Sequence, residues 1–188
     1  QFVGYRLVQG ENPFNINFEM PPFGKYLYGL SAKYLENPYW TTVFLYLSSF
    51  LIFFLLTRNL FKQNRPVLLA LLLFATTPFV ATQLRETMLD LPLMFLYLAH
   101  VWLFIKYLQD PKKLISLALS GILLGLATAT KPGVYTPLAT ILGLLLVFVA
   151  SKKVLNSIFY ASTVFGGYIL AYFPTYFIRH PNPIPWLR

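Results

Sequence analysis

The sequence predicts an all-α fold: a polytopic membrane domain of about six spanning helices with a further helix in a loop. Of its 188 residues, 57% are hydrophobic and only 11% are charged, whereas a soluble domain carries roughly a quarter charged residues. From Tyr39 onward, long apolar stretches alternate with short polar ones. Before Tyr39, prolines and asparagines interrupt every run that could cross a membrane. This composition excludes a water-soluble enzyme, and the absence of cysteine excludes a thiolate nucleophile.

Six apolar stretches are the predicted spanning helices, because each is long enough at about 1.5 Å per residue to cross most of a hydrocarbon core. Their approximate bounds are Trp40 to Thr57, Pro66 to Leu84, Leu91 to Leu108, Leu114 to Thr130, Val134 to Ala150 and Val154 to Ile178. Asn37 and Pro38 combine a capping side chain with a proline, which indicates a helix start. Gly121 and Gly125 form a face of small residues that predicts close helix packing.

We expect two parts in this chain. Residues 1–38 are predicted to be an extracytoplasmic loop, in which the segment Gly24 to Glu36 places Leu27, Leu30 and Tyr34 on one face of an interfacial helix. Residues 39–188 are predicted to be a single transmembrane helical domain. Because the first residue is Gln1 and not Met, we expect a piece of a longer protein, incomplete at both ends.

The distribution of charge predicts the orientation in the membrane. The net charge is +9, but the basic residues punctuate apolar runs, which argues against a nucleic-acid partner. Alternate loops hold Arg58, Lys62, Arg65, Lys106, Lys112, Lys113, Lys152 and Lys153, and the opposite loops hold only Arg85 and Lys131. By the positive-inside rule the first set faces the cytoplasm, where it contacts anionic lipid. The outer side then holds Glu11, Glu19, Glu36, Glu86 and Asp90. We therefore expect an integral protein of the plasma membrane whose chemistry faces outside.

Glu19 is the first candidate site residue. It precedes Pro21 and Pro22, which restrict the backbone and hold the carboxylate at an angle set by covalent geometry. A carboxylate fixed in this way suits a metal ion or a cationic substrate group. The alternative is that Glu19 is a solvated loop acid and that the two prolines merely start a helix.

The second candidate lies between two long apolar stretches, where Arg85, Glu86 and Asp90 follow one another closely. If the first turns are helical, Glu86 and Asp90 share a face, which like charges tolerate only with a cation or a shared proton between them. Arg85 could supply that cation or clamp a phosphate. The alternative is that Asp90 caps the third span, with Pro92 in its first turn, while Arg85 extends to the interface.

Three further ionisable residues stand out. Lys131 closes a tight turn with Pro132 and Gly133, and could contact a lipid phosphate or simply extend to the membrane surface. His100 lies among apolar residues, and a neutral, hydrogen-bonded packing role is favoured there. His180 has no second ligand at a suitable spacing, so it is weak evidence for a metal.

Three segments resemble the ordered landmarks of the protein O-mannosyltransferase and aminoarabinose-transferase superfamily, whose members are glycosyltransferases of the GT-C fold. They are Phe18 to Leu27, Arg85 to Leu93, and Gly121 to Gly133 with its ending Thr130-Lys131-Pro132-Gly133. The resemblance runs from about Val3 to Leu138. It implies a multi-pass enzyme that transfers a mannose-like hexose or related sugar from a polyprenyl-phosphate carrier to a protein, lipid or glycan acceptor on the extracytoplasmic face.

The resemblance also implies roles for single residues. The catalytic base of such families falls upstream of Gln1. Glu19 corresponds to an acid that in one branch is a ligand for a divalent metal ion, although Met20 stands where many relatives have His. Asp90 matches an acid considered important for activity, with Glu86 beside it, and Arg85, Lys25 and Lys131 are candidates for neutralising the donor phosphate. The alternatives are a membrane transporter or lipid flippase, and a non-catalytic membrane subunit.

Overall fold

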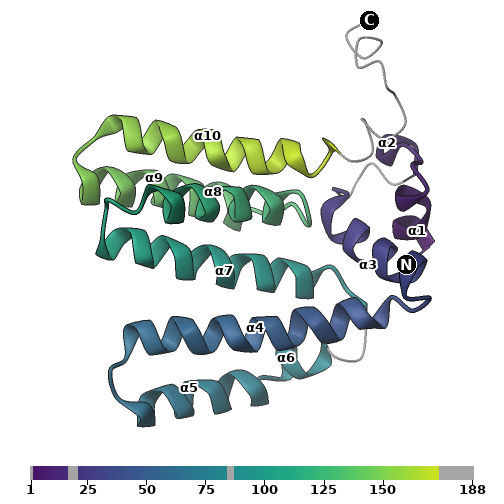
Figure 1. Cartoon of the computed structure of the whole chain (residues 1–188), viewed down its shortest axis with the longest axis horizontal. Coiled ribbons are helices and arrows are strands. Elements are labelled where there is room, and N and C mark those ends of the chain that lie inside the picture. Colours follow the sequence, from purple (N-terminus) through teal and green to yellow (C-terminus); the bar gives the residue numbers. More distant parts are fainter. Residues whose placement is uncertain (1, 17–20, 84–86, 174–188) are drawn as a thin grey trace, which may run out of the picture.

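A computed structural model describes residues 2–16, 21–83 and 87–173, and in these ranges every regular element is helical (Figure 1). The helices are α1 (Phe2–Val8), α2 (Pro13–Ile16), α3 (Phe23–Tyr34), α4 (Tyr39–Leu60), α5 (Asn64–Thr76), α6 (Pro78–Thr82), α7 (Asp90–Gln109), α8 (Leu114–Thr128), α9 (Tyr135–Ser151) and α10 (Val154–Leu170). The all-α prediction is thus confirmed for the described residues.

The long helices lie side by side, and consecutive ones run in opposite directions (Figure 1). α7 packs between α4 and α8, and α8 packs between α7 and α10. The short helices α1 to α3 gather at one end of this bundle, which we call the α3 end. The turns at residues 61–63, 110–113 and 152–153 lie at the opposite end, which we call the basic end.

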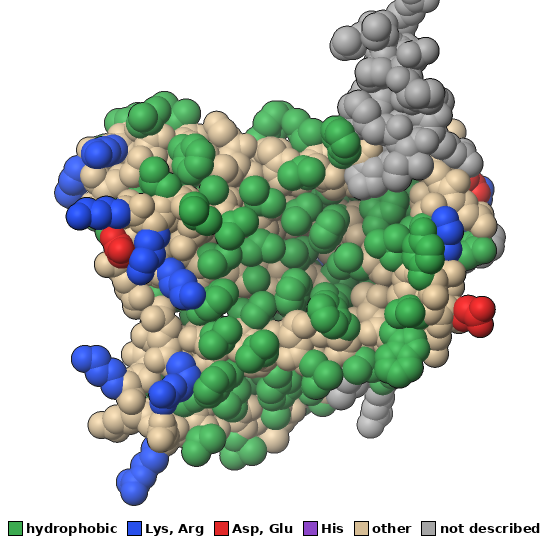
Figure 2. Space-filling model, in the orientation of Figure 1, with side chains coloured by type: hydrophobic (Ala, Val, Ile, Leu, Met, Phe, Trp, Pro, Cys, Tyr) green, Lys and Arg blue, Asp and Glu red, His purple; other side chains and the backbone are tan. Residues whose placement is uncertain are grey.

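Charge separates between the two ends as the sequence predicts. The Lys and Arg side chains of the three turns and of the adjoining helix termini gather at the basic end (Figure 2). Among the described acids, Asp110 lies at the basic end, whereas Glu11, Glu36 and Asp90 belong to loops and helix starts at the α3 end. The predicted alternation of loops is therefore present in the fold.

Two of the predicted spans are long and apolar enough to cross a membrane: α4, with 22 residues, and α7, with 20. α5, α8, α9 and α10 are apolar but have only 13 to 17 residues, or about 20–26 Å against about 30 Å of hydrocarbon. The count of six spanning helices remains a prediction.

The predicted span from Pro66 to Leu84 is wrong as one continuous helix. The chain leaves the helical conformation at Thr77, with φ −62° and ψ 122°, and α6 begins at Pro78. Proline disfavours the helical conformation of the residue before it, and its missing N–H cannot continue the hydrogen-bond ladder. The apolar run hides this break, and Leu84 lies outside the described residues.

The predicted helix-packing role of Gly121 and Gly125 is consistent with the contact between α8 and α10. A Cβ added at Gly121 would collide with Thr163, and one at Gly125 would collide with the backbone of Val164. On the opposite side of α8, His100 of α7 is buried, and its Nδ1 lies 2.9 Å from Ser120 Oγ. This is the hydrogen-bonded packing role predicted for that histidine.

Replacing Gly125 with Val should destabilise the protein by about 1–3 kcal/mol, because the added methyl groups force α8 and α10 apart. The measurement is the free energy of unfolding of the purified protein in detergent. Gly166→Val is the matched control, because a Cβ at Gly166 has no atom within 4 Å. Equal stability of the two variants would contradict close packing at Gly125.

Candidate active site

The α3 end carries an ion pair between two residues that are 41 positions apart in the sequence. Lys131 Nζ donates a hydrogen bond of 2.6 Å to Asp90 Oδ1. The two side chains are 36% and 26% exposed, so the pair is shielded but still reachable. The hydrogen bond to Asp90 holds the pKa of Lys131 above its usual value, and the negative charge of Asp90 acts in the same direction. The ammonium is therefore charged at neutral pH.

The ends of two neighbouring helices position this pair. Asp90 is the first residue of α7, where the helix dipole favours a carboxylate, and Lys131 lies in the turn that follows α8. The alternative that Asp90 caps α7 is wrong, because the N-cap residue is Leu89 and no side chain caps that end. Two candidate residues from separate sequence landmarks thus come into direct contact.

Helix α3 covers the chain segments next to the ion pair. The N–H of Phe23 donates to the carbonyl of Ala129 (2.9 Å), and the hydroxyl of Tyr28 donates to the carbonyl of Met88 (2.9 Å). Tyr28 is only 3% exposed, and burial raises its pKa to about 12. Its hydroxyl therefore remains protonated and acts as a donor. Sequence reasoning missed Tyr28, because tyrosine is common at membrane interfaces and a carbonyl partner leaves no pattern.

An apolar groove of about 300 Å³ begins at Asp90. Its other lining residues are Phe79, Leu93, Met94, Tyr97 and Tyr135. The α7 residues among them recur at helical spacing, so the groove follows α7 for about 10 Å. The hydroxyls of Tyr97 and Thr136 lie 2.7 Å apart, which ties the start of α9 to α7. Asp90 is thus the charged residue of an otherwise apolar groove, and Lys131 is its ion-pair partner.

Comparison with known proteins identifies a family for this chain. The family model described as dolichyl-phosphate-mannose-protein mannosyltransferase matches residues 19–176. The chain belongs to this family. No curated protein and no solved structure matches it. The family consists of membrane glycosyltransferases of the mannosyltransferase type, which is the class of activity that the resemblance implies.

Lys25 is the remaining described candidate of this mannosyltransferase. It lies half-buried in the first turns of α3, and desolvation lowers the pKa of its ammonium. Glu19, Arg85 and Glu86 lie outside the described residues, so their proposed roles remain predictions.

The predicted metal ion finds no ligand set in residues 2–16, 21–83 and 87–173. No group of three His, Cys, Asp or Glu side chains there could hold an ion. Asp90, the candidate carboxylate in these ranges, already accepts a hydrogen bond from Lys131. Glu19, the predicted metal ligand, lies outside the described residues, so the metal ion remains a prediction.

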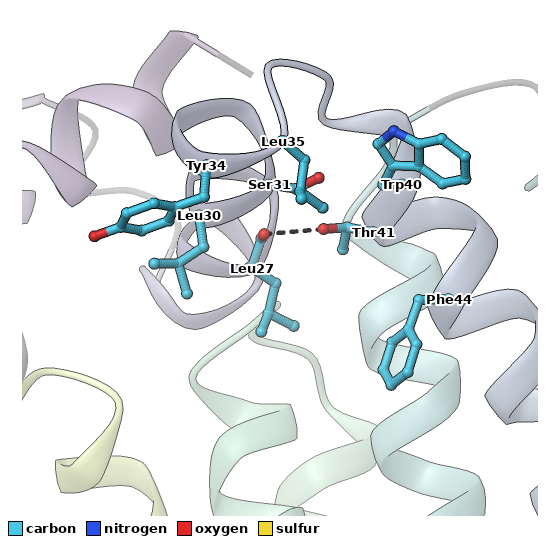
Figure 3. A pocket seen from close by; sticks show the side chains of 8 residues that line it. All are labelled: Leu27, Leu30, Ser31, Tyr34, Leu35, Trp40, Thr41 and Phe44. Carbon is cyan, nitrogen blue, oxygen red and sulfur yellow. Dashed lines mark hydrogen bonds between the residues drawn. The ribbon is translucent and has the colours of Figure 1, made fainter.

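A second apolar groove, of about 560 Å³, separates α3 from the start of α4 (Figure 3). Leu27, Leu30 and Tyr34 line it from α3, and Trp40 and Phe44 line it from α4. The two helices are joined beside it by a hydrogen bond of 3.0 Å from Thr41 Oγ1 to the carbonyl of Leu27. This joint holds α3 across the end of a candidate spanning helix, as an interfacial helix requires.

Replacing Lys131 with Met should lower the free energy of unfolding by no more than about 1 kcal/mol, because a partly exposed ion pair contributes little net stability. Equilibrium unfolding in detergent measures this, with Lys113→Met as the control for a lysine at the opposite end. A loss of about 3 kcal/mol or more would instead indicate a buried structural pair.

Proposed function

We propose that this chain carries the donor-binding part of an enzyme that transfers a mannose-like sugar from a polyprenyl-phosphate carrier to an acceptor on the extracytoplasmic side of the plasma membrane. The observation that carries the proposal is that Asp90, which forms an ion pair with Lys131, also lines an apolar groove. A polyprenyl phosphate has the matching chemistry, an anionic head on an apolar chain.

Lys131 binds the donor phosphate in this mechanism. The bond between the anomeric carbon and the phosphate oxygen breaks, the electron pair remains on the phosphate, and positive charge develops on the sugar. An ammonium has three N–H groups, so Lys131 can donate to Asp90 and to a phosphate oxygen together. Its raised pKa keeps it charged for this purpose. Lys25 and Arg85 are proposed as further phosphate ligands.

Asp90 orients the sugar and stabilises the positive charge that develops on it. The acceptor hydroxyl attacks the anomeric carbon and gives up its proton to a base. The proposal assigns supporting roles in this step to Glu19 and Glu86. Glu19 is also proposed to hold a divalent metal ion, but no step described here depends on it.

The apolar groove is proposed to take the first isoprene units of the carrier. Phe79, Leu93 and Met94 offer an apolar surface along α7 that needs no hydrogen bonds from its occupant. A flippase would also bind such a lipid, but membership of a glycosyltransferase family supports the enzyme. The acceptor, whether protein, lipid or glycan, is bound elsewhere on the same side.

Replacing Asp90 with Asn in the full-length protein should reduce transfer of mannose from a polyprenyl-phosphate donor by at least about 100-fold, because the charge that faces the developing cation is lost. The assay uses radiolabelled donor with isolated membranes. Asp110→Asn, at the basic end, is the matched control and should retain full activity. Undiminished transfer by the Asp90 variant would remove that residue from the site.

The proposed orientation predicts opposite labelling of two exposed lysine positions. In a full-length protein without other cysteines, Lys33→Cys in α3 should react with a membrane-impermeant maleimide in intact cells. Lys113→Cys at the basic end should react only after permeabilisation. The reverse pattern would place the ion pair on the cytoplasmic side.

A further inference from the structure

Each segment that leads into the ion pair is in contact with α3. Phe23 hydrogen-bonds to Ala129, two residues before Lys131, and Tyr28 hydrogen-bonds to Met88, two residues before Asp90. One short helix therefore holds two segments that belong to different helix ends.

Gly24 lies at the closest approach. A Cβ built on Gly24 would lie 2.7 Å from Thr130 Cγ2 and 2.8 Å from Leu89 Cδ2. Thr130 directly precedes Lys131, and Leu89 directly precedes Asp90. The missing side chain thus lets α3 touch the immediate neighbours of both charged residues.

Helix α3 is itself fixed from two other sides. Thr41 and Ser31 donate hydrogen bonds that join α3 to the start of α4, to the carbonyls of Leu27 and Asn37 respectively. On its far side, α3 crosses α1 where Gly4 and Gly29 meet backbone to backbone. A helix held in this way can keep the two segments that it touches at a fixed distance from each other.

We propose that α3 is a brace that sets the separation of Asp90 and Lys131, with Gly24 and Tyr28 as its positioning residues. The inference rests on the proposed function, in which both charged groups face the donor. Neither positioning residue contacts the reacting atoms. A displacement of about 1 Å at either end would loosen the ion pair and misplace its groups, and misplacement on this scale can cost about 100-fold in rate.

Tyr28→Phe tests the brace with the smallest change, because it removes only the hydroxyl that donates to Met88. The expected result is a fall of about tenfold in kcat for mannose transfer with little change in KM for the donor. Tyr26→Phe is the matched control. Tyr26 is a buried tyrosine on the same helix, and its hydroxyl has no hydrogen-bond partner within the described ranges. Loss of the Tyr26 hydroxyl should leave kcat for mannose transfer unchanged.

Gly24→Ala tests the close approach, with Gly166→Ala in open space as its control. The added methyl group collides with Thr130 and Leu89 and pushes α3 away from them, and the expected fall in kcat is about 10- to 100-fold. The amount of folded, membrane-inserted protein is measured in parallel. If Gly24→Ala does not insert, Tyr28→Phe decides the question.

The pH profile separates positioning from a general loss of folded protein. The ammonium of Lys131 faces Asp90 of α7 and Tyr135 of α9, and Tyr28 of α3 lies near Asp90. Since the hydrogen bond to Asp90 raises the pKa of Lys131, loosening it should move the alkaline limb of the profile to lower pH in both positioning variants. A smaller active fraction would lower the rate without moving that limb.

The outcomes distinguish the two proposals. Full transfer by Asp90→Asn would overturn the role that the proposed function gives to the ion pair. Loss of transfer by Asp90→Asn together with wild-type kcat and an unmoved alkaline limb in Tyr28→Phe would overturn the brace alone. A fall in kcat with a shifted limb in Tyr28→Phe, and neither effect in Tyr26→Phe, would support it.

Discussion

The contact between Asp90 and Lys131 depends on where two antiparallel helices of different length begin and end. α7 has 20 residues and α8 has 15, and the turn at residues 110–113 joins them at the basic end. The shorter α8 leaves a short connection before α9, and that connection carries Lys131 back towards the start of α7. The charged pair, the groove below it and the cover formed by α3 all follow from this alignment of helix ends.

The two charges lie at a boundary between media of low and high dielectric constant, which explains why they are paired. A carboxylate or an ammonium alone near hydrocarbon is costly, and the two together satisfy one hydrogen bond while keeping access to water. Because the two side chains are partly exposed, the ammonium of Lys131 can also bind a second anionic group. A partly exposed pair of this kind contributes little to stability, so its proposed role is in binding and not in folding.

The sequence identified Asp90 and Lys131 separately, from a charged loop and a tight turn, and the resemblance grouped them. Their direct contact could not be read from the sequence, because it depends on the relative lengths of α7 and α8. Gly24 and Tyr28 were not predicted from the sequence for another reason. Their partners are side chains and backbone groups of residues far along the chain, and such contacts leave no spacing pattern. The break at Thr77 was hidden by a uniform apolar run, in which only Pro78 hinted at it.

That break has a consequence for a chain in lipid. Interrupting a helix normally strands carbonyl groups where no water can reach them. Here Thr77 Oγ1 donates to the carbonyl of Leu73 at 2.7 Å, and Thr76 Oγ1 donates to that of Leu72 at 2.8 Å. The carbonyl of Leu73 thus gains a hydroxyl donor in place of the Thr77 N–H, which donates to the carbonyl of Phe74 instead, at 3.4 Å. α6 can then take its own direction and bring Phe79 to the groove.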